Sequence, residues 1–365
     1  MNRVLFAGLL LTCATTPAFA FTDADYATAM GATARQVIVP GYESLQAAAD
    51  SLRDEAAALC AAPSAEQLVK AQRAFAAAAT QWARLQFFAL GPISEHQRAA
   101  RIEYWPDKRN VVGRQLTDVL VKQDPAALEP GRFATTSVGV QGLPAMERLL
   151  FEEDALQAVA KAAPGAAFRC GLTAAIGDNL HNIAGDVLTG WTGGDRPVLD
   201  RVEHPNPDDE ELPTARDAAG RLLNDLLTTT IAVRDMKLLS ALGASLEKAK
   251  PQAAEFWRSG QSLAMLTANI EGLRDLFGGE AGLAALLRSI KDGEQVAADV
   301  SATLDQALQA KDKITLPLGE AAADADQRRH VEALAVQLVK LRDLLAGPVA
   351  IHLNLAIGFN ALDGD

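Results

Sequence analysis

Three segments of the chain concentrate side chains that could take part in binding or catalysis. The first is residues 101–110, Arg-Ile-Glu-Tyr-Trp-Pro-Asp-Lys-Arg-Asn, in which charged residues lie on both sides of Trp105. We expect these charges to line a cleft. The simpler alternative is a turn in which Trp105 is buried and Pro106 sets the bend. Asp107 or Asn110 would then cap the following helix.

The second segment is residues 139–147, Gly-Val-Gln-Gly-Leu-Pro-Ala-Met-Glu. Pro144 is suited to the first turn of a helix, and Glu147 would then lie near the positive end of the helix dipole. Glu147 either serves a site or merely stabilises that turn. The third segment is the tail, residues 358–365, which follows Pro348 and several apolar residues and is expected to dock rather than fray.

Most standard catalytic signatures are absent from the sequence. It contains no H-E-x-x-H, no phosphate-binding G-x-x-x-x-G-K-[ST], no G-x-S-x-G and no C-x-x-C. The five histidines include no close pair at helical spacing, which disfavours a histidine-rich metal cage.

The composition is that of a globular protein. The 365 residues are 49% hydrophobic and 5% aromatic, and the net charge is −12. This acidic balance disfavours nucleic acid as a partner. Because no apolar run reaches about 18 residues, we expect no transmembrane helix in the mature chain.

The first twenty residues have the pattern of a secretory signal peptide. Arg3 precedes an apolar stretch, and Ala18-Phe19-Ala20 provides an A-x-A cleavage site. The alternative is a lipoprotein acylated at Cys13, although Thr12 is larger than the residue usual before such a cysteine. In an exported protein, Cys60 and Cys170 are expected to form a disulfide.

Helical periodicity extends along the chain, and no segment alternates as a strand would. Apolar stripes predict helices at 64–90, 111–121 and 164–188, and others that carry Leu45 to Leu59, begin near Leu222, open at Pro251 and bury Leu334 to Leu345. The Gly-, Pro- and acid-rich stretch 196–213 is the expected linker between an N-terminal bundle, 21–195, and a C-terminal bundle, 214–365. Its acidic run, residues 204–211, is either a solvated linker or a site for a hard cation.

The chain resembles the imelysin-like proteins, a bacterial cell-envelope family. The resemblance covers essentially the whole mature chain and depends on these segments: Phe87–Pro92, Tyr104–Arg109, Gly142–Phe151, Arg169–Cys170 and the tail Gly-Phe-Asn-Ala-Leu-Asp-Gly-Asp at 358–365. It implies an all-α fold of two helical bundles packed side by side, a periplasmic or surface location, a link to iron acquisition, and a site between the bundles. Some members are described as metallopeptidases.

The sequence departs from the family's G-x-H-x-x-E motif. Gly142 and Glu147 match, but Pro144 occupies the histidine position. One carboxylate cannot hold a transition metal, so Glu147 would need other ligands, and the nearest by type are Glu103, Asp107, Asp363 and His352. A zinc hydrolase usually needs three protein ligands, so the departure disfavours an enzyme.

We therefore expect a non-catalytic accessory of iron acquisition that binds a metal, a metal complex or an envelope partner. Iron or another divalent metal is the possible cofactor, and a metallopeptidase-type hydrolase with an atypical site is the alternative. No catalytic residue is assigned. The candidate binding residues of the cleft between the bundles are Glu103, Trp105, Asp107, Arg109, Gly142, Pro144, Glu147, Asn360 and Asp363.

Overall fold

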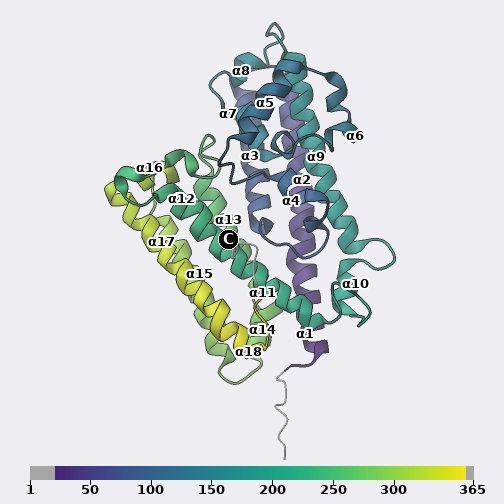
Figure 1. The fold of residues 1–365 in the computed structure, drawn as a ribbon, viewed down its shortest axis with the longest axis vertical. Helices are drawn as coiled ribbons and strands as arrows, with labels where there is room; N and C mark the ends of the chain where they lie inside the picture. The colour runs from purple at the N-terminus through teal and green to yellow at the C-terminus, as the bar shows by residue number, and fades with distance from the viewer. Residues whose placement is uncertain (1–20, 359–365) are drawn as a thin grey trace, which may run out of the picture.

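The computed structural model describes residues 21–358, and these residues form helices with no β-strand. Figure 1 shows two groups of long helices that lie side by side. The predicted all-α fold of two bundles is confirmed. The predicted signal peptide, Cys13, Asn360 and Asp363 lie outside the described residues.

The first bundle is built on three long helices: α2 (Val39–Ala61), α3 (Ala65–Leu85) and α9 (Ala166–Thr192). Leu45, Leu52 and Leu59 of α2 are buried, as their spacing predicts. Burial of each leucine side chain stabilises the folded state by about 1.5–3 kcal/mol. The Ser64 hydroxyl accepts a hydrogen bond from the Gln67 N–H at 3.2 Å and caps the start of α3. This helix ends at Leu85, before the predicted end at 90.

A disulfide between Cys60 of α2 and Cys170 of α9 joins two helices of this bundle, as predicted. Shorter helices complete this bundle: α4 (Arg98–Ile102), α5 (Val111–Lys122), α6 (Pro130–Phe133), α7 (Leu143–Phe151) and α8 (Ala155–Ala158). The short helix α7 packs on both α3 and α9.

The second bundle contains α11 (Ala215–Ala232), α13 (Ser262–Phe277), α15 (Gly293–Asp312) and α17 (Ala325–Leu344). Leu334, Leu338 and Leu341 form the buried face of α17. Shorter helices complete it: α12 (Leu239–Leu242), α14 (Gly282–Arg288), α16 (Leu318–Ala323) and α18 (Ala350–His352). The described part of the C-terminal segment docks on α11, because the Gly358 N–H donates to Asn224 Oδ1 at 3.1 Å.

The two groups of helices meet where α3 packs against α13. A side chain at Gly272 of α13 would collide with the Arg84 carbonyl of α3, so the small residue permits this close approach. The N-terminal helix α1 (Asp23–Thr33) packs against α11 and α14. Because α1 belongs to the predicted N-terminal bundle but packs against the second one, the division of the chain into bundles 21–195 and 214–365 remains a prediction.

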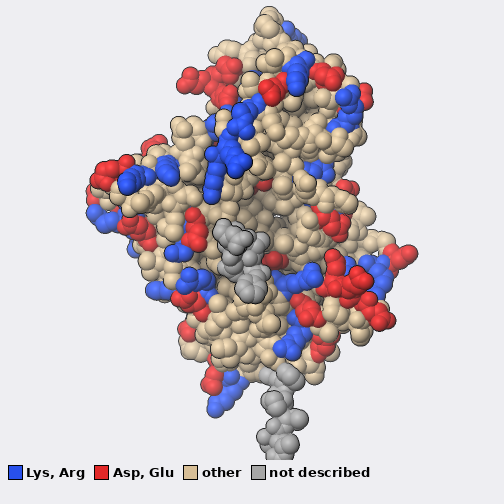
Figure 2. Space-filling view, in the orientation of Figure 1, with Lys and Arg blue, Asp and Glu red and all other residues tan. Residues whose placement is uncertain are grey.

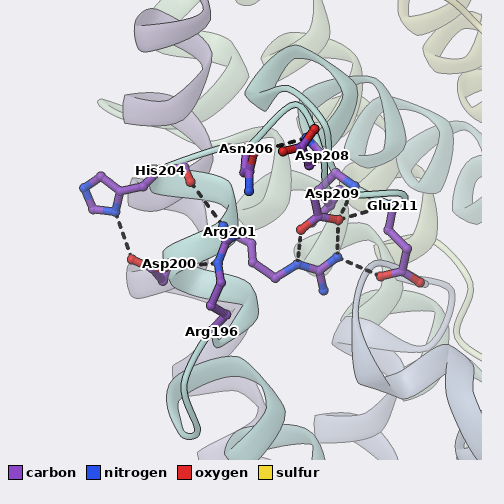
Figure 3. A network of polar contacts seen from close by, with 9 residues as sticks. Arg196, Asp200, Arg201, His204, Asn206, Asp208, Asp209 and Glu211 are labelled. Atoms are coloured by element: carbon purple, nitrogen blue, oxygen red, sulfur yellow. Dashed lines mark hydrogen bonds and ion pairs between the residues drawn. The ribbon is translucent and has the colours of Figure 1, made fainter.

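The predicted acidic linker, residues 196–213, is held by hydrogen bonds from an arginine side chain. The Arg201 guanidinium, on the short helix α10 (Val198–Glu203), donates two hydrogen bonds of 2.7 Å to Asp209 and one of 3.0 Å to Glu211 (Figure 3). The bonds from Arg201 lower the pKa of Asp209. Because its oxygens also accept from the Glu211 and Leu212 N–H groups, Asp209 is engaged by the protein itself.

The prediction that Pro251 opens a long helix is wrong. Pro251 begins a single turn, Pro251–Ala253, and the helix α13 starts only at Ser262. The ring of Phe256 instead packs edge-on against Phe75 of α3, with ring centroids 5.4 Å apart. Its φ of +47° is unusual for a bulky side chain, and burial of the ring stabilises this conformation. Residues 251–261 thus dock onto the first bundle.

Candidate functional site

A cleft of about 850 Å³ opens between the two bundles. We call it the inter-bundle cleft. One wall is formed by residues 104–108, Asn110 and the start of α7. The opposite wall is formed by Met236, Ser240, Lys250, residues 252–254 and residues 256–258. Figure 2 shows lysine and arginine side chains gathered where the α5–α7 end of the first bundle approaches the second. This volume is typical of a small-molecule site.

Glu147 is buried at the inner end of the cleft and is held by a serine from the other wall. Its Oε1 accepts from the Ser259 N–H at 2.9 Å and from the Ser259 hydroxyl at 2.8 Å. Burial raises the pKa of Glu147, and the bonds from Ser259 oppose that rise. Pro144 lies in the first turn of α7, as predicted, and also lines the cleft.

Gly142 fixes the position of α7 beneath residues 101–110. A Cβ at this glycine would overlap the carbonyl oxygens of Arg101 and Ile102 at the end of α4. Only glycine therefore lets the start of α7 approach α4 so closely. This contact brings the predicted segments 101–110 and 142–147 together along one wall.

Residues 103–109 have several distinct roles. Asp107 caps α5, because its two carboxylate oxygens accept from the Val111 and Val112 N–H groups at 2.7 and 2.9 Å. Trp105 is half-buried and lines the cleft with Asp107, so it is not the fully buried tryptophan of the simpler alternative. Arg109 is exposed and is not among the residues that line the cleft.

Glu103 lies below the cleft in a buried polar network. Its Oε2 accepts from Trp82 Nε1 and Gln86 Nε2, both at 2.8 Å. Burial, followed by the negative charge of Glu255, raises the pKa of Glu103 well above its usual range. Glu103 therefore stabilises the wall of the inter-bundle cleft from the protein interior.

Lys237 provides the positive charge of this network. Its Nζ donates to Glu255 Oε2 and Asn269 Oδ1 at 2.6 Å and to Gln86 Oε1 at 2.7 Å. The Lys237 and Glu255 side chains are each only 1% exposed. Lys237 lies in a π-helical turn, Val233–Leu238, of the kind that is frequent at functional sites. Neither Lys237 nor Glu255 belongs to the segments that stand out in the sequence.

The residues present do not fit a transition-metal site at Glu147. Within residues 21–358, no group of three or more His, Cys, Asp or Glu side chains is arranged to hold a metal ion. Glu147 Oε1 is bonded to Ser259, Asp107 caps α5, and His352 Nδ1 lies 2.8 Å from the Pro348 carbonyl. Asp363 lies outside the described residues.

Two residues of the opposite wall, Trp257 and Arg258, were also missed. The Arg258 guanidinium lies over the Trp257 ring at 4.3 Å from its centroid. Burial, and next the positive charge of Arg148, lowers the pKa of Arg258. The dipeptide Trp-Arg at 257–258 resembles the aromatic-and-cation composition around Trp105, which is the signal that could have identified it.

No helix in the described part of the chain combines the length and apolar character needed to cross a membrane.

Among solved structures, an imelysin-like protein from Psychrobacter arcticum superposes with a TM-score of 0.75 at 21% identity, covering 93% of this chain and 98% of that one. A putative iron-regulated protein A precursor from Parabacteroides distasonis gives a TM-score of 0.74 at 15% identity, covering 93% and 97%. These similarities support the fold.

A curated relative is iron-regulated protein A of Synechococcus elongatus, which is 26% identical over 247 residues. The alignment covers 67% of this chain and 62% of that protein, so the chain spans less than two thirds of the length of this relative. The family model for imelysin matches residues 38–345. That match spans most of the chain, and the protein belongs to the imelysin family.

Proposed function

We propose that this protein is a non-catalytic binding protein of the bacterial cell envelope that serves iron acquisition. The inter-bundle cleft would hold its ligand, an iron complex or part of an envelope partner. The observation that carries the proposal is the way Glu147 is held: the Ser259 N–H and hydroxyl both donate to its Oε1, and no metal-ligand group is assembled around it within residues 21–358.

The proposed location draws on the sequence pattern of residues 1–20 and on the disulfide. A bond between Cys60 and Cys170 is characteristic of proteins that fold in an oxidising compartment. The iron link draws on the family and on the name of the cyanobacterial relative. Both support the proposal of a periplasmic or surface protein that handles iron.

The proposal is tested in cells. A deletion strain complemented with Trp105→Ala should grow more slowly under iron limitation than one complemented with the wild type, and equally well in iron-rich medium. The matched control is Trp191→Phe, which changes a buried tryptophan of α9 away from the cleft. Equal growth of all strains under iron limitation would contradict the iron role.

A peptidase assay with added zinc or iron distinguishes this binding function from the alternative, a metallopeptidase-type hydrolase. We expect no metal-dependent cleavage of a mixed peptide substrate. Metal-dependent cleavage that is lost in Glu147→Ala would instead establish the hydrolase, with a site completed by residues that the described part of the chain does not bring together.

A further inference from the structure

The charge of the inter-bundle cleft is opposite to that of the protein as a whole. Cationic side chains outnumber carboxylates along it: Lys108, Arg148, Lys250 and Arg258 line it against Asp107 and Glu147. The full chain carries a net charge of −12. A local excess of positive charge on an acidic protein concentrates anions at that position.

Three of these cations lack an ion-pair partner in the described part of the chain. Within residues 21–358, Lys108, Lys250 and Arg258 make no ion pair, whereas Arg148 pairs with Glu152 at 3.1 Å. Asp107, a half-buried carboxylate of the same cleft, is occupied by the backbone of α5. The three unpaired cations therefore remain available to a ligand.

Arg258 is the most constrained of the three. It is partly buried beside Trp257, and the nearby positive charge of Arg148 adds repulsion. The carboxylates of Glu147, Glu152 and Asp107 offset part of that repulsion, and an anion bound beside Arg258 would offset more of it. Guanidinium groups recognise carboxylates through two parallel hydrogen bonds, so Arg258 is suited to a carboxylate ligand.

Glu147 lies beside these cations. Burial raises its pKa, and the bonds from Ser259, followed by the positive charges of Arg258 and Arg148, oppose that rise. Because its Oε1 is already engaged by Ser259, an anion in the cleft would contact the cations rather than this carboxyl group.

We propose that the inter-bundle cleft binds a small polycarboxylate anion, free or as its ferric complex, through Lys108, Lys250 and Arg258 beside Glu147. The inference deepens the proposed function and rests on it for the ferric complex. It places recognition on the anionic groups that surround the iron, so the protein itself supplies no metal ligand. Carboxylate oxygens are hard ligands that suit a hard cation such as ferric iron.

The test is isothermal titration of the mature protein with citrate and with ferric citrate at pH 6. We expect citrate to bind, with an affinity that falls as salt is added because the contacts are ionic. The Lys250→Gln/Arg258→Gln double variant should bind at least about tenfold more weakly, since charge-assisted contacts are lost. Lys291→Gln/Arg329→Gln, which removes two exposed cations elsewhere, is the control and should bind as the wild type does.

Thermal melts of both double variants should match the wild type, which separates loss of binding from loss of folding. If citrate fails to bind, or binds the Lys250→Gln/Arg258→Gln variant as tightly as the wild type, the polycarboxylate proposal is wrong. Inorganic phosphate binding as tightly as citrate, through the same cations, would also overturn it. Ferric citrate binding more tightly than citrate supports iron as cargo, and binding only free citrate contradicts that part. The growth defect of Trp105→Ala tests the wider proposed function independently.

Discussion

At the scale of single residues, the observed role of Glu147 is to accept hydrogen bonds from Ser259. Glu147→Gln keeps a carbonyl oxygen for the Ser259 N–H and hydroxyl, whereas Glu147→Ala leaves both donors without this acceptor. We expect urea denaturation at pH 7 to show a loss of about 1–3 kcal/mol for Glu147→Ala and a loss smaller than that for Glu147→Gln. Equal losses in the two variants would contradict this role.

Asp225 is a half-buried acid, and its titration predicts a pH dependence of stability. Its Oδ2 accepts from the Ala89 and Leu90 N–H groups at 2.9 and 3.3 Å, and burial raises its pKa to about 7. An unfolded aspartate titrates near a pKa of about 3.9. The folded state therefore binds more protons between about pH 4 and pH 7, so the contribution of Asp225 to stability falls as pH rises through this range.

Asp225→Asn should remove that dependence. The amide stays neutral and can still accept from Ala89 and Leu90. At pH 8 we expect the variant to be more stable than the wild type by on the order of 1–2 kcal/mol, because partial exposure weakens the penalty on the charged form. At pH 4 the difference should vanish. Denaturant titrations at both pH values measure it, with Asp118→Asn, an exposed aspartate of α5, expected to retain the wild-type slope.

The candidate site could be predicted from the sequence only on one side. Trp105, Pro144 and Glu147 belong to distinctive local segments, and the structure brings them to one wall. Lys237 and Glu255 could not be found in the same way, because a lone charged residue in a helical or polar stretch has the appearance of a solvated one. Their burial depends on contact with the end of α3, more than 150 residues away along the chain.

At the scale of elements, the contact between α4 and α7 determines whether the cleft wall forms. Gly142→Ala would force its methyl group into the Arg101 and Ile102 carbonyls. We expect a loss of about 1–3 kcal/mol in unfolding free energy, the usual effect of overpacking, together with weaker ligand binding because α7 is displaced. Chemical denaturation measures the first effect and calorimetry with citrate the second.

Gly131→Ala is the matched control, since a Cβ there meets no atom within 4 Å. This change should leave stability unchanged or raise it slightly, because alanine favours the helical conformation of α6. If Gly142→Ala behaves like Gly131→Ala, the close approach of α4 and α7 is not required.

Helices with long apolar stripes could be predicted from the sequence, since burial of one face alone defines them. The buried leucines of α2 and α17 are examples. The path of the segment 251–261 could not be predicted from the sequence, because Pro251 is as compatible with a single turn as with a long helix. Its irregular path depends on Phe256 packing against Phe75 and on Ser259 bonding to Glu147, both of which are tertiary contacts.

At the scale of the whole molecule, the two bundles share one buried charged network. Gln86 follows α3 of the first bundle, whereas Lys237 and Asn269 belong to the second, and the three meet through hydrogen bonds of the lysine Nζ. A buried ion pair adds little net stability compared with an apolar pair, but removing one partner is costly. The network therefore favours one arrangement of the bundles over others in which a charge would remain unpaired.

Lys237→Met tests this coupling. The variant leaves the carboxylate of Glu255 buried without its cation, so we expect the unfolding free energy at pH 7 to fall by about 3–5 kcal/mol. Adding Glu255→Gln removes the stranded charge and should recover at least half of that loss, although each substitution alone is destabilising. Denaturant unfolding of the wild type, both single variants and the double variant gives the coupling energy. Additive losses in the double variant would show that Lys237 and Glu255 stabilise the bundle junction independently of each other.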